Sequence, residues 1–422
     1  MPVLLCASCL KEQEDFFPEP SPIRLQNSIE RTMQVLQDAP YGWAMDYYPD
    51  RSLSYGGYVY TLRFDSLHVE VRTELSQPQE SRTSYYSMTT DGGSVLTFDT
   101  YNEFIHFFAT PSSAEYEAKD GDFEFVIDSV AEDVVRMHGK RTLNTVTLHR
   151  LREDPVSYLR KVIDMGENFS SHLTGQIEGV DVDIDIDLNT RHLTYAFLGR
   201  AEEHYFVYTD QGIRLLTPIT VGRQQVDELR VDGENHLTSP LTSSIELQGE
   251  PHDSLFVPFS DYAGIYRFVF YDEQMSPTVR LTPDKFRGGF LLEGINSNYK
   301  LFLGYDKNTG SLTLVPQLLG VFRNETDGLR YGVYLLAWDT TSGLLSLNND
   351  CGMRTVWNGD SSTPLFRWES NGHPRFTTDS YYLSVIYNDS DGSLVQKAPP
   401  SAWLVGGSMR YIPHLNYLLK TQ

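Results

Sequence analysis

Short runs of alternating hydrophobic and polar residues dominate the chain between residues 42 and 151. Within these runs Tyr, Phe, Val and Leu recur at every second position, and Gly and Asp separate one run from the next. This period is typical of β-strands that bury one face. The pattern predicts an antiparallel meander with strands at residues 58–62, 67–71, 84–88, 95–98, 123–127 and 145–148.

Two other segments have helical spacing. Apolar residues recur every three or four positions between residues 23 and 36, and Pro40 follows, so we expect an amphipathic helix that packs on a sheet. Residues 154–165 begin with Asp154, a good N-cap residue, and Pro155 occupies the first helical position. We expect a second helix there.

Residues 181–188 show the strictest alternation in the chain, with four aspartates interleaved with aliphatic residues. A strand would place the four carboxylates on one face, where they repel one another. A solvated face, or one paired with Lys or Arg, is the preferred interpretation, and a calcium site is the alternative. The calcium-loop pattern needs Gly at its sixth position, where Ile186 stands, so we predict no metal site.

A hairpin pattern recurs three times in the last third of the chain. An aromatic residue is followed by Asp or Asn, three turn residues, Gly, one further residue and an aliphatic residue. The Asp or Asn side chain can accept bonds from nearby backbone N–H groups, and Gly can adopt positive φ. Unequal spacing disfavours a propeller and favours a sandwich or barrel. The three copies are residues 305–312, 338–345 and 387–394.

These patterns predict a mainly β protein with two antiparallel β lobes, sandwich-like or barrel-like, the first with two accessory α-helices. The 422 residues agree with two or three domains, at about 100–200 residues each. We place a signal remnant and tether at 1–22, the N-terminal lobe at 23–240 and the C-terminal lobe at 255–422. A Ser/Thr/Pro-containing stretch separates the lobes.

Charge narrows the possible partners. The chain has 57 acidic and 34 basic residues, for a net charge of −23, which would repel a phosphate backbone and argues against nucleic-acid binding. Its 40% hydrophobic and 13% aromatic content is that of a globular protein. No run approaches the roughly 18 apolar residues of a membrane-spanning helix.

The three cysteines, Cys6, Cys9 and Cys351, cannot build a disulfide framework or a structural zinc site. Ala7-Ser8-Cys9 resembles a bacterial lipoprotein signal, in which the cysteine becomes the lipidated first residue of the mature chain. The acidic run at 11–15 is similar to the export tag of Bacteroidetes surface lipoproteins. Only eight residues precede Cys9, fewer than a signal peptide needs, so we expect the natural start further upstream. The alternative is a soluble protein with a frayed N-terminus.

No motif names a reaction. The chain lacks the HExxH, Gly-x-Ser-x-Gly and phosphate-loop patterns, and no two of its eleven histidines are two or four residues apart. We therefore predict no catalytic residue and no cofactor. A glycosidase needs only two carboxylates at the right distance, and Asp99, Glu103, Asp122 and Glu124 are the candidates for that alternative. Ordinary edge carboxylates are the preferred interpretation.

Aromatic residues supply the candidate ligand site. Adjacent tyrosines in a strand point to opposite faces, so one member of each pair enters the core and the other can meet solvent or a ligand. An exposed row of rings would stack on sugars or flat ligands, but packing of both rings in the core is the preferred interpretation. The candidates are Trp43, Tyr48, Tyr86 and Tyr101.

Several short motifs together resemble a family of Bacteroidetes surface lipoproteins catalogued as a domain of unknown function. The resemblance implies an outer-membrane protein, anchored by lipid and facing the cell exterior, encoded beside nutrient-import receptors and their glycan-binding or peptide-binding partners. It implies no catalytic residue. The expected function is an accessory binding protein of an import system; a hydrolase and a non-binding structural subunit are the alternatives. The motifs are Gly42-Trp43, Tyr47-Tyr48-Pro49, Gly56-Gly57-Tyr58, Ser84-Tyr85-Tyr86, residues 96–102, His106-Phe107-Phe108, residues 121–125, residues 298–301 and residues 317–320.

Overall fold

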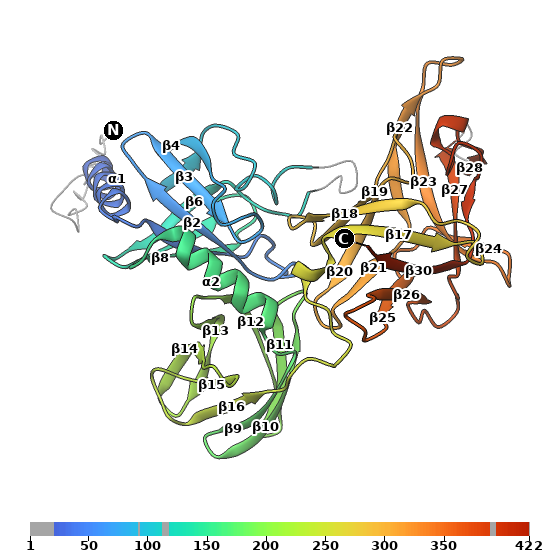
Figure 1. The fold of residues 1–422 in the computed structure, drawn as a ribbon. Coiled ribbons are helices and arrows are strands. Elements are labelled where there is room, and N and C mark those ends of the chain that lie inside the picture. The colour runs from blue at the N-terminus through green and yellow to red at the C-terminus, as the bar shows by residue number, and fades with distance from the viewer. Residues whose placement is uncertain (1–20, 92, 112–117, 389–393, 422) are drawn as a thin grey trace, which may run out of the picture.

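The strands form three closed antiparallel barrels and one further sheet in the computed structural model, which describes residues 21–91, 93–111, 118–388 and 394–421 (Figure 1). We call them barrel 1 (residues 43–150), barrel 2 (172–249) and barrel 3 (264–420). The predicted mainly β fold with two accessory helices is confirmed. The expected N-terminal lobe, residues 23–240, comprises barrel 1 and all of barrel 2 except its last strand.

Barrel 1 contains all six strands that the alternation predicts. It closes because β1 pairs with both β2 and β8. The pattern does not predict β1 or β7; β1 is buried on both faces and therefore has no alternation. The strands are β1 (Trp43–Tyr47), β2 (Tyr58–Phe64), β3 (His68–Thr73), β4 (Arg82–Thr90), β5 (Ser94–Phe98), β6 (Glu124–Val130), β7 (Val134–Gly139) and β8 (Thr145–Arg150).

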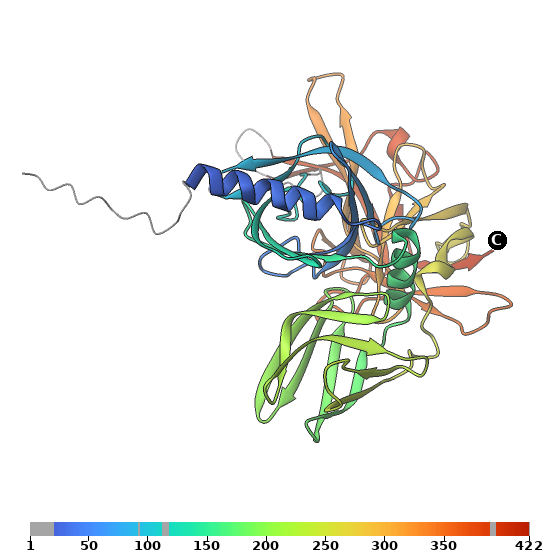
Figure 2. The ribbon, with the colours of Figure 1, turned by 90° about the vertical axis from the view of Figure 1, so that its left-hand side faces the viewer.

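Both predicted helices are present. Helix α1 (Ser21–Gln37) lies alongside barrel 1, with Ile29 and Leu36 buried against it (Figure 2). Helix α2 (Pro155–Asn168) begins after Asp154, whose side chain accepts a hydrogen bond from Ser157 N at 3.0 Å. It contacts strands of barrel 1 and barrel 2, so it connects the two barrels.

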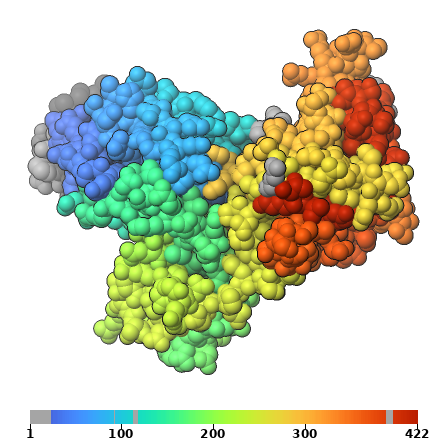
Figure 3. All heavy atoms as spheres, viewed as in Figure 1, coloured from blue at the N-terminus to red at the C-terminus, as the bar shows by residue number. Residues whose placement is uncertain are grey.

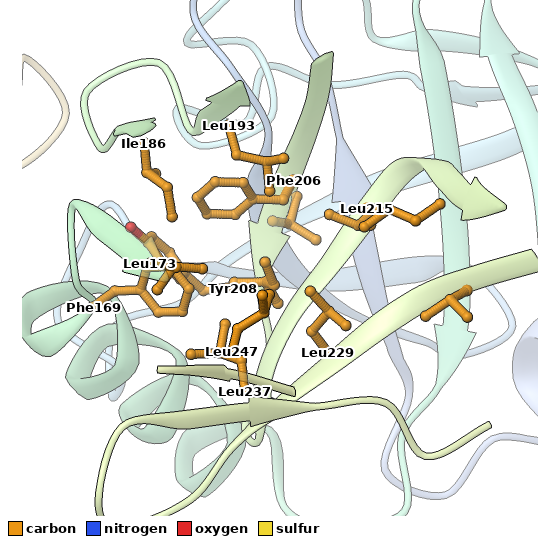
Figure 4. Packing of buried hydrophobic residues seen from close by; sticks show 14 of the residues in the cluster. Phe169, Leu173, Ile186, Leu193, Phe206, Tyr208, Leu215, Leu229, Leu237 and Leu247 are labelled. Atoms are coloured by element: carbon orange, nitrogen blue, oxygen red, sulfur yellow. The ribbon is translucent and has the colours of Figure 1, made fainter. Parts of the chain in front are cut away.

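The strand predicted from the alternating aspartates at residues 181–188 is present as β10 of barrel 2. Val182, Ile184 and Ile186 of β10 enter the barrel core, where Figure 4 shows Ile186. Asp181, Asp183 and Asp185 are exposed on the other face. His172 pairs with two of them, 3.1 Å from Asp183 and 3.2 Å from Asp185. The strands are β9 (His172–Ile177), β10 (Val180–Asp187), β11 (His192–Phe197), β12 (Arg200–Tyr208), β13 (Gly212–Val221), β14 (Gln224–Val231), β15 (His236–Thr238) and β16 (Ile245–Gly249).

Barrel 3 closes through the pairing of its first and last strands, β17 and β30. Its strands are β17 (Gly264–Phe270), β18 (Thr278–Asp284), β19 (Gly289–Glu293), β20 (Leu301–Asp306), β21 (Ser311–Leu314), β25 (Met353–Trp357), β26 (Leu365–Ser370) and β30 (Leu415–Lys420).

The chain segments between β21 and β25 and between β26 and β30 of barrel 3 form a further sheet (Figure 1). Its strand order is β22-β23-β27-β28, and β24 pairs with β23 while β29 pairs with β27. Two short 3-10 helices, Phe259–Tyr262 and Ser401–Trp403, lie outside the strands. The strands of this sheet are β22 (Gln317–Arg323), β23 (Arg330–Asp339), β24 (Leu344–Ser346), β27 (Ser380–Asn388), β28 (Leu394–Lys397) and β29 (Tyr411–Ile412).

Two of the three predicted hairpin turns form as expected. Asp306 accepts from the backbone N–H of Asn308 at 3.0 Å, and Asp339 accepts from that of Thr341 at 3.0 Å. The glycines that close these turns, Gly310 and Gly343, have φ of 67° and 74°. The third turn and the predicted lipidation residue Cys9 lie outside the described residues. None of the helices described has both the length and the apolar character to cross a membrane.

Candidate functional site

The four aromatic candidates are not brought together on a surface. Trp43 is fully buried in barrel 1, Tyr48 is 3% exposed and packs against barrel 2, and Tyr86 is 6% exposed. The Tyr86 hydroxyl donates to Asp65 O at 2.7 Å. Burial of these three rings leaves little of their surface open to a ligand. Tyr101 is 68% exposed, and its ligand role stays a prediction.

The four carboxylates considered for hydrolysis accept hydrogen bonds within turns or form ion pairs and hydrogen bonds at the surface. Asp122 is buried and accepts from the backbone amides of Arg141 at 2.7 Å and Thr142 at 3.1 Å. Glu103 pairs with Arg82 at 3.1 Å, Glu124 lies 3.4 Å from Lys140, and Asp99 accepts from Ser87 at 2.9 Å. These contacts explain the four residues as structural.

A cavity of about 280 Å³ lies where the three barrels, α2 and the segment after β16 meet. Figure 3 shows the barrels meeting near the middle of the molecule. The charged residues that line it are five basic ones, Lys119, Arg191, Lys285, Arg287 and Lys307, and two acidic ones, Glu74 and Glu167. Its aromatic lining consists of Tyr58, Tyr208, His252, Phe256, Phe259, Phe286 and Tyr305.

Arg191, in the turn before β11, fixes barrel 2 to barrel 1 at one wall of the cavity. Its guanidinium donates to both oxygens of Glu74, at 2.8 and 2.7 Å, and to Gly57 O at 2.6 Å. It also lies 4.9 Å from the ring centre of Tyr58 and 4.6 Å from that of Tyr208. Because Arg191 and Glu74 neutralise each other, this wall carries little net charge. Their two parallel hydrogen bonds also hold the wall in a fixed geometry.

Gly56 allows the two barrels to approach this closely. A Cβ on Gly56 would lie 2.1 Å from the carbonyl oxygen of Thr190, and its φ of 71° also favours glycine. The Gly56-Gly57 pair noted in the sequence therefore lies at the interface between barrels 1 and 2.

Barrel 3 forms the opposite wall through two turns. Phe286, between β18 and β19, packs against Phe107 of barrel 1 with ring centres 4.9 Å apart. Asn308, between β20 and β21, accepts from Leu188 N at 2.8 Å and donates to Asp187 at 3.0 Å. These contacts fix the turns that carry Lys285, Arg287 and Lys307.

Lys285 and Lys307 present ammonium groups that are not neutralised by a close partner. Both are half-buried, and among the described residues no hydrogen bond or ion pair to either ammonium is found. Burial lowers the pKa of Lys307 to about 8; Arg191 acts in the same direction, and Glu74 partly offsets it. Burial raises the pKa of Glu167, and Lys285 partly offsets that rise. The cavity is thus more cationic than the acidic chain as a whole.

Two further polar atoms of lining residues have no partner within the described part of the chain. These are the Tyr208 hydroxyl and His252 Nε2, and both atoms are buried. Buried polar groups are nearly always hydrogen-bonded, so each requires an explanation. The rings, the unneutralised cations and these two groups together suit the binding of a small polar ligand.

Sequence reasoning missed this cavity because its residues come from segments far apart in the chain. Two of those segments, 56–58 and 305–312, belong to motifs noted above. The motifs indicate turns and a family resemblance, but nothing in them indicates a shared cavity.

Comparisons with known proteins name families without an activity. The family model described as Domain of unknown function (DUF4302) matches residues 13–233, which is more than half of the chain. A second model, DUF4987, also described as a domain of unknown function, matches residues 239–384. No curated protein and no solved structure matches the chain.

Proposed function

Because the chain belongs to the family described as Domain of unknown function (DUF4302), whose description names no activity, we propose a function from the cavity itself. The protein is an accessory binding protein of a nutrient-import system and holds a glycan or peptide ligand between its three barrels. It is a lipid-anchored Bacteroidetes protein of the outer membrane that faces the cell exterior.

One observation carries the binding role. Seven aromatic rings and several polar groups from all three barrels converge on one cavity of about 280 Å³. Ligand sites in proteins combine an apolar, aromatic lining with a few placed polar groups, and they lie preferentially between domains. The inter-barrel contacts hold these walls in place before a ligand arrives, which reduces the entropic cost of binding.

A hydrolase has less support from the same cavity. Of its two carboxylates, Glu74 is held by Arg191 in a bidentate ion pair, and burial raises the pKa of the other, Glu167. Glycoside hydrolysis needs a second carboxylate that is free to attack the sugar or to activate a water, and both oxygens of Glu74 are bonded to Arg191 instead. Binding without chemistry is therefore the preferred function.

A thermal-shift panel of neutral and acidic oligosaccharides and short peptides tests the binding role. A ligand that binds the native state raises the melting temperature, by an amount equivalent to about 2.7 kcal/mol at a hundred times its Kd. We expect at least one hit that Ile163→Trp abolishes, because Ile163 lines the cavity and a larger side chain would fill it. Arg160→Trp, at an exposed position of α2, is the control. Absence of any hit, or a hit that Ile163→Trp leaves unchanged, would contradict the proposal.

The anchor has its own test. Ala7-Ser8-Cys9 supports acylation of Cys9. In cells that express the chain behind a complete signal sequence, Cys9→Ala should release the protein from the membrane fraction, whereas Cys6→Ala should not. Retention of the Cys9→Ala protein in membranes would overturn the assignment.

A further inference from the structure

We propose that the ligand of the inter-barrel cavity is an acidic sugar, a uronic acid, whose carboxylate binds between Lys285 and Lys307. This inference rests on the proposed function above and names the class of ligand. Three features of the cavity carry it: its unneutralised cations, its unpartnered polar atoms and the shape of its walls.

The cations give the cavity its preference for an anion. Arg191 and Glu74 cancel each other, and Arg287 lies over the Phe302 ring, 3.8 Å from Asp284. Lys285 and Lys307 are half-buried, and no described residue pairs with their ammonium groups. A half-buried cation is partly stripped of water, so a ligand carboxylate gains more from it than from a surface lysine. In a chain with a net charge of −23, this concentration of positive charge is distinctive.

The unpartnered atoms indicate that the site lacks something polar. Tyr208 is buried, lines the cavity and carries a hydroxyl that donates to no described residue. Burial raises the pKa of Tyr208, so the hydroxyl stays protonated and can act as a donor. A ligand oxygen within reach of this hydroxyl would satisfy it.

The walls favour a sugar over a peptide. A bound peptide commonly adds a strand to an exposed sheet edge, but the strands beside this cavity belong to closed barrels, which have no free edge. At about 280 Å³ the cavity is near the small end of ligand sites, roughly 300–1,000 Å³, and suits one or two sugar rings. Rings such as Tyr305 and Phe259 can stack on the apolar face of a pyranose.

Affinity for such a ligand should fall as the pH rises. The charged groups around Lys307 are Arg191, Glu74, Asp187 and Lys285, and its pKa is about 8. The ammonium is therefore mostly charged at pH 7 and mostly neutral at pH 9. His252 and Glu167 also face the cavity; burial lowers the pKa of the histidine, which keeps it neutral in this window, and raises that of the glutamate.

Calorimetric titration of the full chain with three probes tests the inference: digalacturonate, its neutral counterpart galactobiose, and tetraglutamate. We expect digalacturonate to bind at least ten-fold more tightly than either of the others. Lys285→Met and Lys307→Met should each weaken its binding about ten-fold. Lys300→Met, on the same barrel but paired with Glu293 outside the cavity, should leave it unchanged. The weakening between pH 7 and pH 9 should disappear in Lys307→Met.

Tyr208→Phe provides a variant that should not disturb folding, because no described residue bonds to the hydroxyl that it removes. We expect several-fold weaker digalacturonate binding with an unchanged melting temperature of the free protein. Tyr299→Phe is the matched control, since its hydroxyl is also buried and unpartnered but lies outside the cavity.

The outcomes separate the two proposals. Equal or tighter binding of galactobiose or tetraglutamate would overturn the uronic-acid inference while leaving the binding function in place. Digalacturonate binding that none of the three cavity variants weakens would also overturn it. Failure of all three probes, while another member of the thermal-shift panel binds, would overturn the inference alone. Silence across the whole panel would overturn the binding function itself.

Discussion

At the scale of single residues, Arg191 forms a buried ion pair that joins barrels 1 and 2. Its side chain and that of Glu74 are both buried, with exposures of 3% and 6%. Removing one member of a buried ion pair leaves the other charge unpaired, which typically costs about 3–5 kcal/mol.

Arg191→Met should therefore lower the free energy of unfolding, measured in urea, by about 3–5 kcal/mol. The double variant Arg191→Met/Glu74→Leu should recover much of this loss, because it removes the unpaired carboxylate as well. Arg223→Met, at an exposed turn of barrel 2, should change stability by less than about 0.5 kcal/mol. A loss below about 1 kcal/mol in Arg191→Met would contradict this account of the junction.

The aromatic candidates show what residue patterns can and cannot predict. Tyr47 and Tyr48 do point to opposite sides, one into barrel 1 and the other toward barrel 2. The alternation rule predicts this correctly, but it takes the outer face to meet solvent. Here α2 and barrel 2 cover that face, and such a long-range contact leaves no local signal in the sequence.

At the scale of elements, local chemistry predicted both helices and most of barrel 1. Both helices and all six proposed strands of barrel 1 are present, because periodicity, capping and turn residues act within a few positions of one another. β1 could not be predicted, since burial on both faces removes its alternation. The closure of each barrel was also beyond these rules, because it pairs strands from opposite ends of a segment.

The turns at Asp306 and Asp339 share one sequence pattern, so the effects of substituting the two aspartates can be compared directly. Asp306 accepts from Asn308 N within its own turn and from Asn189 Nδ2 of barrel 2 at 2.9 Å. Asp339 accepts from Thr341 N and Ser342 N within its own turn and from the backbone of Thr377, and no described residue of another barrel bonds to it.

Both Asp306→Ala and Asp339→Ala should destabilise the protein in urea, by about 1 kcal/mol for the turn itself. Asp306→Ala should cost about 1 kcal/mol more, because it also removes a bond between barrels. Equal losses in the two variants would show that the bond to Asn189 contributes nothing to holding barrel 3 in place.

At the scale of the whole molecule, three barrels enclose one cavity that none of them contains alone. Length predicted two or three domains, and composition predicted an acidic globular protein, but neither could place Lys285, Lys307 and Tyr208 around one space. The walls come from segments up to about 250 residues apart, between Tyr58 and Lys307, and only the packing of the barrels brings them together. The central claim is that this shared cavity is where the protein binds its ligand.

A crystal structure of the full chain with the strongest hit of the thermal-shift panel tests that claim most directly. The account predicts the ligand between the barrels, with an acidic group near Lys285 and Lys307 and a ring against the aromatic wall. A ligand bound elsewhere, for example at the exposed ring of Tyr101, with the inter-barrel cavity holding only water, would contradict it.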